Sequence, residues 1–169
     1  TAETRLRVDF GGGVKSNESL EAAFKAGASQ VTAGSIAAKN PELVKTWLKE
    51  FGQEKIILGA DVMAEKIAIN GWQQDSGLDL FPFLEDYLNH GVKYCICTDV
   101  SKDGMLQGPS GDLYKKILKA FPEIHLIASG GVAELDDLKM LQDIGVYGTI
   151  VGKAYYEGRI TLEQLAEFK

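Results

Sequence analysis

A glycine-rich pattern that occurs twice does more than any other feature of this sequence to limit its fold. Each copy reads Gly-Gly-Val, then a leucine after five residues, a glycine after six more and another glycine after a further six. The first copy runs from Gly12 to Gly34 and the second from Gly130 to Gly152, a shift of 118 residues. We interpret the copies as a duplicated strand–helix–strand unit. The alternative is a coincidence between two such units, because both would contain glycine-rich turns in any case.

Short apolar segments alternate with helical patterns along the chain. Leu20, Ala23 and Phe24 form one helical stripe, and Asn40-Pro41 is typical of a helix start. Regular alternation of apolar strands and helices indicates a mainly parallel sheet. No linker separates the units, so residues 1–169 are predicted to form a single domain. The expected strands are 5–10, 30–33, 55–60, 93–98, 124–128 and 147–151.

The spacing of the repeat predicts how many strands the complete fold has. Residues 11–129 contain four strand–helix units, and doubling that number gives the eight units of a (β/α)8 TIM barrel. Only six units are visible in the sequence. We therefore expect an α/β fold of this class, a TIM barrel with a twofold internal repeat, whose N-terminal two βα units are absent from this sequence. An open six-stranded α/β sheet is the alternative.

Composition and charge exclude several classes of function. Hydrophobic residues make up 45% and charged residues 25% of the chain, as in ordinary globular domains, and no apolar run is long enough to span a membrane. The formal net charge of −6 argues against binding to nucleic acid or to acidic membranes. Cys95 and Cys97 lie in one expected strand and are not expected to pair with each other, so they are expected to be reduced thiols of a cytoplasmic protein. A complete barrel is expected to be a monomer.

Glycines follow the expected strands at equivalent places in both copies. In a (β/α)8 barrel the active site lies at the carboxyl ends of the strands, and backbone N–H groups at helix starts there can bind phosphate. The repeat therefore predicts two phosphate sites and one small substrate with a phosphate at each end. The alternative is that the glycines only make tight turns. The candidate phosphate-binding residues are Gly13, Lys15, Gly34, Ser35, Gly130, Gly131, Gly152 and Lys153.

Two aspartates are the candidates for acid–base chemistry. Asp61 is expected directly after the third strand, where a carboxylate can act as a general acid or base, although turn or capping aspartates are also common there. Asp103 lies in the loop after the fourth strand, and its alternative is an Asx-type turn. Thr98 and Asp99 precede that loop, and Asp99 is expected to brace it.

The remaining polar and aromatic candidates are weaker. Trp72 is expected either to stack on a ligand ring or to cover the barrel edge. His90 and His125 lie away from the expected strand ends, and no cluster has metal-ligand spacing, so neither a metal nor an organic cofactor is expected. Segments 62–79 and 101–110 are predicted to be loops that close over the substrate.

Several motifs together resemble a known enzyme family. The segments GADV (59–62), NGW (70–72) and TDVSKDG (98–104) are the specific ones, and the glycine motifs FGGGVKS (10–16) and ASGGV (128–132) accompany them. They are similar to the histidine-biosynthesis isomerase family, the phosphoribosylformimino-5-aminoimidazole carboxamide ribotide isomerases. The resemblance covers essentially the whole chain, as strands three to eight of the family's barrel.

The resemblance implies an Amadori rearrangement, an aldose–ketose isomerisation without a cofactor. It implies that Asp61 is the proton donor, that Asp103 is a second carboxylate and a rival for that role, and that Thr98 positions the substrate or a carboxylate. Trp72 would pack against the substrate, and the glycine sites with Ser35 and Lys153 would bind its two phosphates. Many members carry arginine where Lys15 stands; lysine keeps the positive charge but lacks the bidentate fork with which arginine binds phosphate. The family's general base lies at the end of strand one, so these 169 residues alone are expected to lack substantial isomerase activity.

Three other functions are consistent with the same pattern. One is the cyclase subunit of imidazole glycerol phosphate synthase, which shares the twofold barrel and the phosphate sites. Another is a non-catalytic phosphate-binding barrel fragment, which would not need Asp61 or Asp103. The last is a structural half-barrel that dimerises through its open strand edge.

Overall fold

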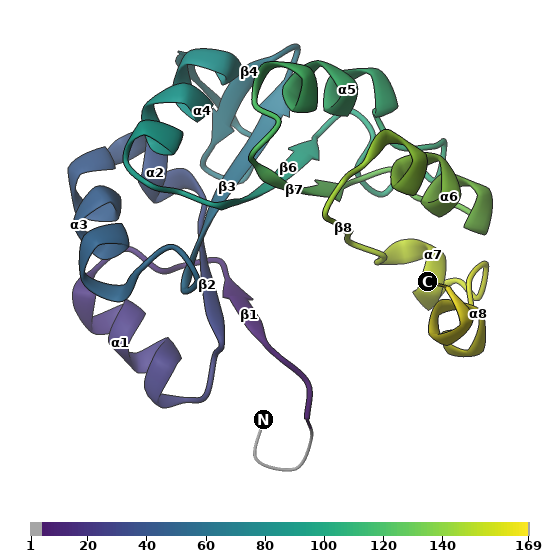
Figure 1. Ribbon diagram of the computed structural model, residues 1–169, viewed down its shortest axis with the longest axis horizontal. Helices are drawn as coiled ribbons and strands as arrows, with labels where there is room; N and C mark the ends of the chain where they lie inside the picture. Colours follow the sequence, from purple (N-terminus) through teal and green to yellow (C-terminus); the bar gives the residue numbers. More distant parts are fainter. Residues whose placement is uncertain (1–4, 169) are drawn as a thin grey trace. The chain divides into compact units, whose positions relative to one another are not determined.

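The computed structural model describes residues 5–168, which form two compact units, the first ending at Ile96 and the second beginning at Cys97 (Figure 1). Strand β6 (Tyr94–Asp99) runs across the division between the units. Each unit is described separately below. The prediction of a single domain stays a prediction.

The first unit contains three parallel strands joined by helices. The register pairs Phe10 with Val31 and Val31 with Ile56, so β1, β2 and β3 lie side by side in chain order. After β3 an antiparallel hairpin, β4–β5, leads into α4. The elements are β1 (Asp9–Gly11), α1 (Asn17–Lys25), β2 (Gln30–Ala33), α2 (Ser35–Lys39), α3 (Pro41–Phe51), β3 (Ile56–Met63), β4 (Lys66–Ile69), β5 (Gln74–Asp79) and α4 (Leu80–Asn89).

Local signals in the sequence explain where the helices of the first unit begin. Ser16 caps α1 by accepting a hydrogen bond from the backbone N–H of Ser19, and Asn40 caps α3 by accepting one from that of Leu43. The buried faces of these helices cover the strands, and Trp47 of α3 is fully buried. The helix starts thus agree with the sequence pattern, and the helices fix where the strands end.

Strand pairing after β3 corrects the prediction that residues 62–79 form a loop and that Asp61 follows a strand end, because β3 and β4 form a hairpin of their own and β4 forms a second one with β5. β3 continues through Asp61 to Met63, because Val62 and Met63 pair with β4. The two residues of the connecting turn, Ala64 and Glu65, both have positive φ, as a type I′ turn requires. The usual signal for such a turn is glycine with asparagine or aspartate, and Ala64-Glu65 lacks it, so the hairpin could not be predicted from the sequence.

The second unit repeats the strand–helix–strand arrangement. β7 pairs in parallel with β8, with Ile127 opposite Gly148. Tyr114 of α5 is fully buried and donates a hydrogen bond from its hydroxyl to the carbonyl of Ser129, 2.9 Å away, which ties that helix to the end of β7. The elements are α5 (Gly111–Ala120), β7 (His125–Ser129), α6 (Leu135–Ile144), β8 (Gly148–Thr149), α7 (Lys153–Tyr156) and α8 (Leu162–Glu167).

The two copies of the sequence repeat have the same succession of elements. The first is β1–α1–β2 followed by the short helix α2, and the second is β7–α6–β8 followed by the short helix α7. Parallel strands that alternate with helices in this way are those of an α/β fold of the TIM-barrel type. The expected first and last strands, 5–10 and 147–151, are shorter in the structure, at three and two residues.

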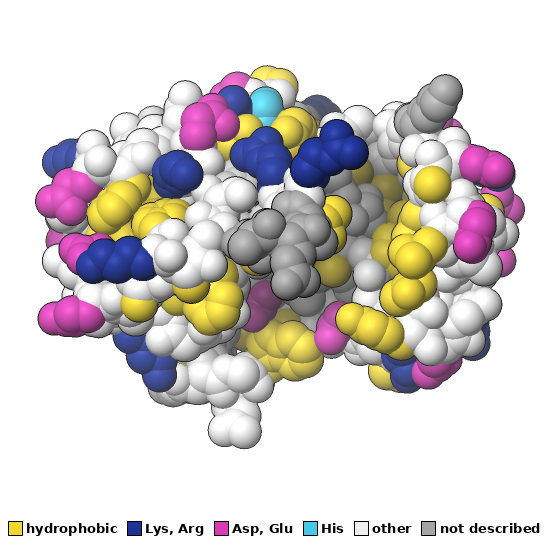
Figure 2. All heavy atoms as spheres, turned by 90° about the horizontal axis from the view of Figure 1, so that it is seen from below, with side chains coloured by type: hydrophobic (Ala, Val, Ile, Leu, Met, Phe, Trp, Pro, Cys, Tyr) yellow, Lys and Arg dark blue, Asp and Glu magenta, His cyan; other side chains and the backbone are white. Residues whose placement is uncertain are grey.

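Large hydrophobic side chains also reach the surface, and Figure 2 shows such groups on the face seen from below. In the second unit, Tyr156 of α7 is 83% exposed and Leu162 of α8 is 59% exposed. Within residues 5–168, no helix combines the length and apolar character needed to cross a membrane.

Candidate functional site

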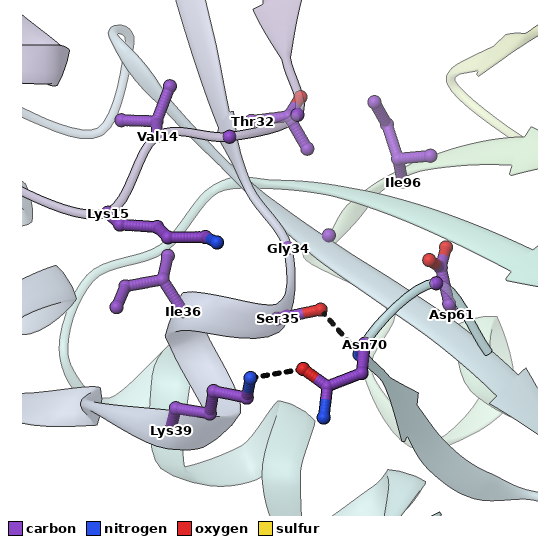
Figure 3. A pocket seen from close by; sticks show the side chains of 14 residues that line it. Val14, Lys15, Thr32, Gly34, Ser35, Ile36, Lys39, Asp61, Asn70 and Ile96 are labelled. Carbon is purple, nitrogen blue, oxygen red and sulfur yellow. Dashed lines mark hydrogen bonds between the residues drawn. The ribbon is translucent and has the colours of Figure 1, made fainter. Parts of the chain in front are cut away.

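A cavity of about 510 Å³ lies at the strand ends of the first unit (Figure 3). Its walls come from the β1–α1 turn, the end of β2 and the helix α2 that follows it, β3, the turn between β4 and β5, and Ile96 of β6. Two ammonium groups and one carboxylate lie among these walls, so the cavity offers both cationic and anionic groups to a ligand. The lining residues are Gly12, Gly13, Val14, Lys15, Thr32, Gly34, Ser35, Ile36, Lys39, Gly59, Asp61, Asn70, Gly71 and Ile96.

The glycines of the β1–α1 turn leave open backbone beside this cavity. Gly12 and Gly13 have φ of +90° and +80°, a conformation that other residues rarely adopt. A Cβ atom at either position would meet no other atom within 4 Å. Packing therefore does not explain these glycines, whereas the backbone conformation and access to a ligand do.

Asp61 lies on the wall formed by β3, and the indole of Trp72 is its hydrogen-bond partner. The Nε1–H of Trp72 donates to Oδ2 of Asp61 across 2.8 Å. Trp72 remains 41% exposed, so part of its side chain is accessible from solvent. The nearby Cys95 is buried in the core. Its burial, and to a lesser extent the negative charge of Asp61, raise the pKa of the Cys95 thiol to about 12.

Helix α2 contacts the turn between β4 and β5. The backbone N–H of Asn70 donates to the hydroxyl of Ser35 at 3.3 Å, and the ammonium of Lys39 donates to Oδ1 of Asn70 (Figure 3). Lys15 reaches into the same cavity from the β1–α1 turn. Sequence reasoning missed Lys39 and Asn70. The dipeptide Asn70-Gly71 was a turn signal, but nothing in the sequence paired it with Lys39.

The second unit has its own cavity, of about 250 Å³, at the ends of β7 and β8. The ammonium of Lys153 donates to the carbonyl oxygen of Gly104 at 2.9 Å and lies 3.6 Å from Oε1 of Glu157. Lys153 thus contacts the loop that carries Asp103. The lining residues are Asp103, Gly104, Leu106, Ser129, Gly130, Gly131, Val132, Ile150, Gly152 and Lys153.

The glycines of this second cavity are required by packing, unlike those of the first. A Cβ atom at Gly131 would lie 2.3 Å from the carbonyl oxygen of Gly108, whose N–H donates to the carbonyl of Gly131. A Cβ atom at Gly130 would lie 3.1 Å from the carbonyl oxygen of Asp99. The loop after β6 therefore packs directly on the β7–α6 turn and fixes the position of Asp103.

Thr98 and Asp99 end β6 and differ in their roles. Thr98 is buried, with 7% of its surface exposed, and lines neither of the two cavities. Asp99 accepts hydrogen bonds from the backbone N–H and the hydroxyl of Ser101 and from the hydroxyl of Ser110. It braces the loop, in agreement with the sequence-based expectation.

The structure divides the sequence candidates into two groups. Gly13, Lys15, Gly34, Ser35 and Asp61 line the cavity of the first unit, and Trp72 lies beside it through its bond to Asp61. The other group lines the cavity of the second unit, and consists of Asp103, Gly130, Gly131, Gly152 and Lys153.

Comparison with known proteins shows similarity along nearly the whole chain. The profile of a family described as "Histidine biosynthesis protein" matches residues 1–161. A protein of Cytophaga hutchinsonii is 60% identical over 168 residues, which cover 99% of this chain and 70% of that protein. Proteins of Bacteroides thetaiotaomicron and Flavobacterium johnsoniae are 59% and 56% identical, each over 98% of this chain and 69% of their own length.

All three relatives carry the name 1-(5-phosphoribosyl)-5-((5-phosphoribosylamino)methylideneamino)imidazole-4-carboxamide isomerase. The similarity includes every segment in which the sequence motifs were found. The expectation that these 169 residues lack isomerase activity is not borne out by this close similarity to isomerases.

Proposed function

This chain belongs to the histidine biosynthesis protein family, and on that premise we propose that it catalyses the isomerisation for which its relatives are named. The reaction is an Amadori rearrangement, in which a ribosyl aminoaldose is opened and converted to a ribulosyl aminoketose. Proton transfers suffice for this chemistry, and positioned carboxylates can perform them. The observation that carries the proposal is that Asp61 lines a cavity whose other walls offer strand-end glycines, Ser35 and two lysines.

Acid–base catalysis of this reaction needs a proton at one sugar atom and a base at another. An acid protonates the ring oxygen so that the sugar opens, and a base then removes the proton from C2. We assign the acid role to Asp61 and keep Asp103 as its rival, because each aspartate lines a cavity. Trp72 packs against the substrate and positions Asp61 through its N–H. Thr98, which lies outside both cavities, positions a carboxylate rather than the substrate.

The substrate is a small phosphoribosyl compound, and we propose that it carries two phosphates, one for each cavity. Backbone N–H groups beside glycines and lysine ammonium groups are suited to phosphate oxygens. In the first unit these groups come from Gly13, Gly34 and Ser35, with Lys15 close by. In the second unit they come from Gly130, Gly131, Gly152 and Lys153.

The cyclase and the non-catalytic binding module remain the alternatives to this proposal. The isomerase is favoured over the cyclase because the relatives matched over 98–99% of this chain are named isomerases. A module that only binds phosphate does not need an oriented carboxylate, whereas Asp61 beside the cavity is oriented by the indole N–H of Trp72. We further propose that the protein is cytoplasmic, consistent with the two free, buried cysteines, that it acts on a small molecule and does not bind nucleic acid, and that a complete barrel is a monomer.

A two-substrate assay tests the proposed function. The purified protein is supplied with the aminoaldose alone and, separately, with the aminoketose and ammonia, and the products are separated by chromatography. An isomerase converts the aminoaldose to the aminoketose and incorporates no ammonia in the second mixture. Conversion of only the second mixture would identify a cyclase, and binding without conversion of either would identify a binding module.

A further inference from the structure

The turn between β4 and β5 has an unusual backbone. Asn70, Gly71 and Trp72 have φ of +57°, +63° and +69°, so three consecutive residues are left-handed. Glycine and asparagine tolerate this region, but a tryptophan there is sterically unfavourable. Such a conformation persists only where surrounding contacts favour it over the alternatives. The contacts that favour this turn therefore determine where Trp72 lies.

Helix α2 supplies two of those contacts from one side. Ser35 and Lys39 are four residues apart, which places both side chains on the same face of the helix. The Ser35 hydroxyl accepts the backbone N–H of Asn70 at 3.3 Å, and the Lys39 ammonium donates to the side-chain carbonyl of Asn70. Both the backbone and the side chain of Asn70 are thus bound by α2 (Figure 3).

The same turn ends at the candidate acid. Trp72 lies two residues after Asn70 and donates its indole N–H to Asp61 across 2.8 Å. A continuous series of hydrogen bonds and covalent links therefore runs from Lys39 through Asn70 and Trp72 to Asp61. We propose that Lys39 is a positioning residue, which binds Asn70 and so keeps the Trp72 indole directed at Asp61. This inference rests on the proposed function, because it assigns Lys39 a part in the isomerisation.

Lys39 also lines the cavity, so a direct contact with a substrate phosphate is the competing role. An ammonium group has three N–H donors, and a contact with Asn70 leaves others available. The two roles differ in their effect on the protein without substrate. A positioning residue affects Trp72 in the free protein, whereas a residue that only binds phosphate does not.

Acrylamide quenching of tryptophan fluorescence measures that effect directly. The chain has two tryptophans, of which Trp47 is fully buried and Trp72 is 41% exposed, so quenching reports on Trp72. The test compares the unsubstituted protein with Lys39→Met, with Lys39→Arg as the conservative variant. Lys49→Met is the matched control, because Lys49 is an exposed lysine on the neighbouring α3.

The proposal predicts stronger quenching in Lys39→Met, recovery in Lys39→Arg and no change in Lys49→Met. It also predicts that kcat of Lys39→Met falls by roughly tenfold, because the reaction slows when a catalytic group such as Asp61 is displaced by even a fraction of an ångström. If Lys39→Met does not fold, Asn70→Gly replaces it. That variant preserves the left-handed turn and removes the side-chain acceptor, and the same increase in quenching is expected.

Unchanged quenching in Lys39→Met would overturn the proposal, whatever happens to the rate. A higher KM with unchanged quenching and kcat would assign Lys39 to phosphate binding instead. If the wild-type protein does not isomerise the aminoaldose, the proposed function fails, and the quenching comparison still decides whether Lys39 positions Trp72.

Discussion

The indole N–H of Trp72 donates a hydrogen bond to Oδ2 of Asp61 across 2.8 Å, from a turn that is eleven residues further along the chain. The hairpin β4–β5 makes this contact possible, because it folds the segment after β3 back over the end of that strand. Asp61 is therefore not a free carboxylate at the cavity wall. One of its oxygens accepts a hydrogen bond from a side chain that is itself 41% exposed.

Replacing Trp72 by phenylalanine should separate its hydrogen bond from its ring. Trp72→Phe keeps an aromatic surface but removes the N–H donor to Asp61. Hydrogen bonds to charged groups contribute about 1.5–3 kcal/mol, so we expect kcat to fall by about tenfold at this partly exposed site. Steady-state kinetics measures the loss. Leu78→Ala, at an exposed position on the same hairpin, is the control, and equal losses in both variants would show that the hydrogen bond has no specific role.

The two copies of the repeat provide a matched pair of glycine substitutions. Gly13 and Gly131 are equivalent in the repeat and have φ of +80° and +86°. Alanine at either position should cost about 1–2 kcal/mol, because L-residues disfavour left-handed backbone. Gly131→Ala also places a Cβ atom 2.3 Å from the carbonyl oxygen of Gly108, whereas Gly13→Ala meets open space.

We therefore expect Gly131→Ala to lose about 1–3 kcal/mol more stability than Gly13→Ala, as overpacked sites do. Urea unfolding of both variants measures the difference. Equal free energies of unfolding would mean that the loop after β6 does not pack on the β7–α6 turn as described.

Much of the fold was predictable because the repeat and the caps are local signals. The strand Gln30–Ala33 lies where the sequence placed it, and so does the helix start at Pro41. These elements depend on apolar periodicity and on capping side chains that are close in sequence. The family resemblance likewise depended on contiguous segments, and the comparisons confirmed it.

The β3–β4 hairpin was not predictable, because its turn uses Ala64 and Glu65 in place of the glycine that usually marks left-handed backbone. The sequence therefore placed Asp61 after a strand, and it offered no partner for Trp72. Lys39 was missed for a related reason. Its contact with Asn70 joins residues 31 positions apart, and periodicity carries no information about such pairs.

Lys153 should affect substrate affinity more than an ordinary surface lysine does. Its ammonium lines the cavity of the second unit and contacts the carbonyl of Gly104. Lys153→Met removes a charged donor proposed to bind a phosphate, so KM should rise by about tenfold. Lys139→Met is the control, because Lys139 forms an exposed ion pair with Asp136 on α6. The phosphate assignment would be wrong if KM were the same in both variants.

The Cys95 thiol should resist alkylation in the folded protein. Burial first, and then the charge of Asp61, raises its pKa to about 12, so the reactive thiolate is scarce even in mild base. We expect iodoacetamide to label Cys95 slowly at about pH 7 and hardly faster at about pH 9, whereas a free thiol with a pKa near 8.5 would react much faster at the higher pH. Mass spectrometry of the labelled protein measures this, and rapid labelling in denaturant is the positive control. A steep rise with pH in the native state would show that the thiol is accessible.

The most direct test of the account is to measure turnover and substrate affinity together in Asp61→Asn. Asparagine preserves the shape of the side chain and an acceptor for Trp72, but it cannot donate a proton as a carboxylic acid does. The account predicts that kcat falls by at least about a hundredfold, while the dissociation constant of the substrate changes by less than about threefold. Wild-type turnover in Asp61→Asn would contradict the central claim that Asp61 is the proton donor of this isomerase.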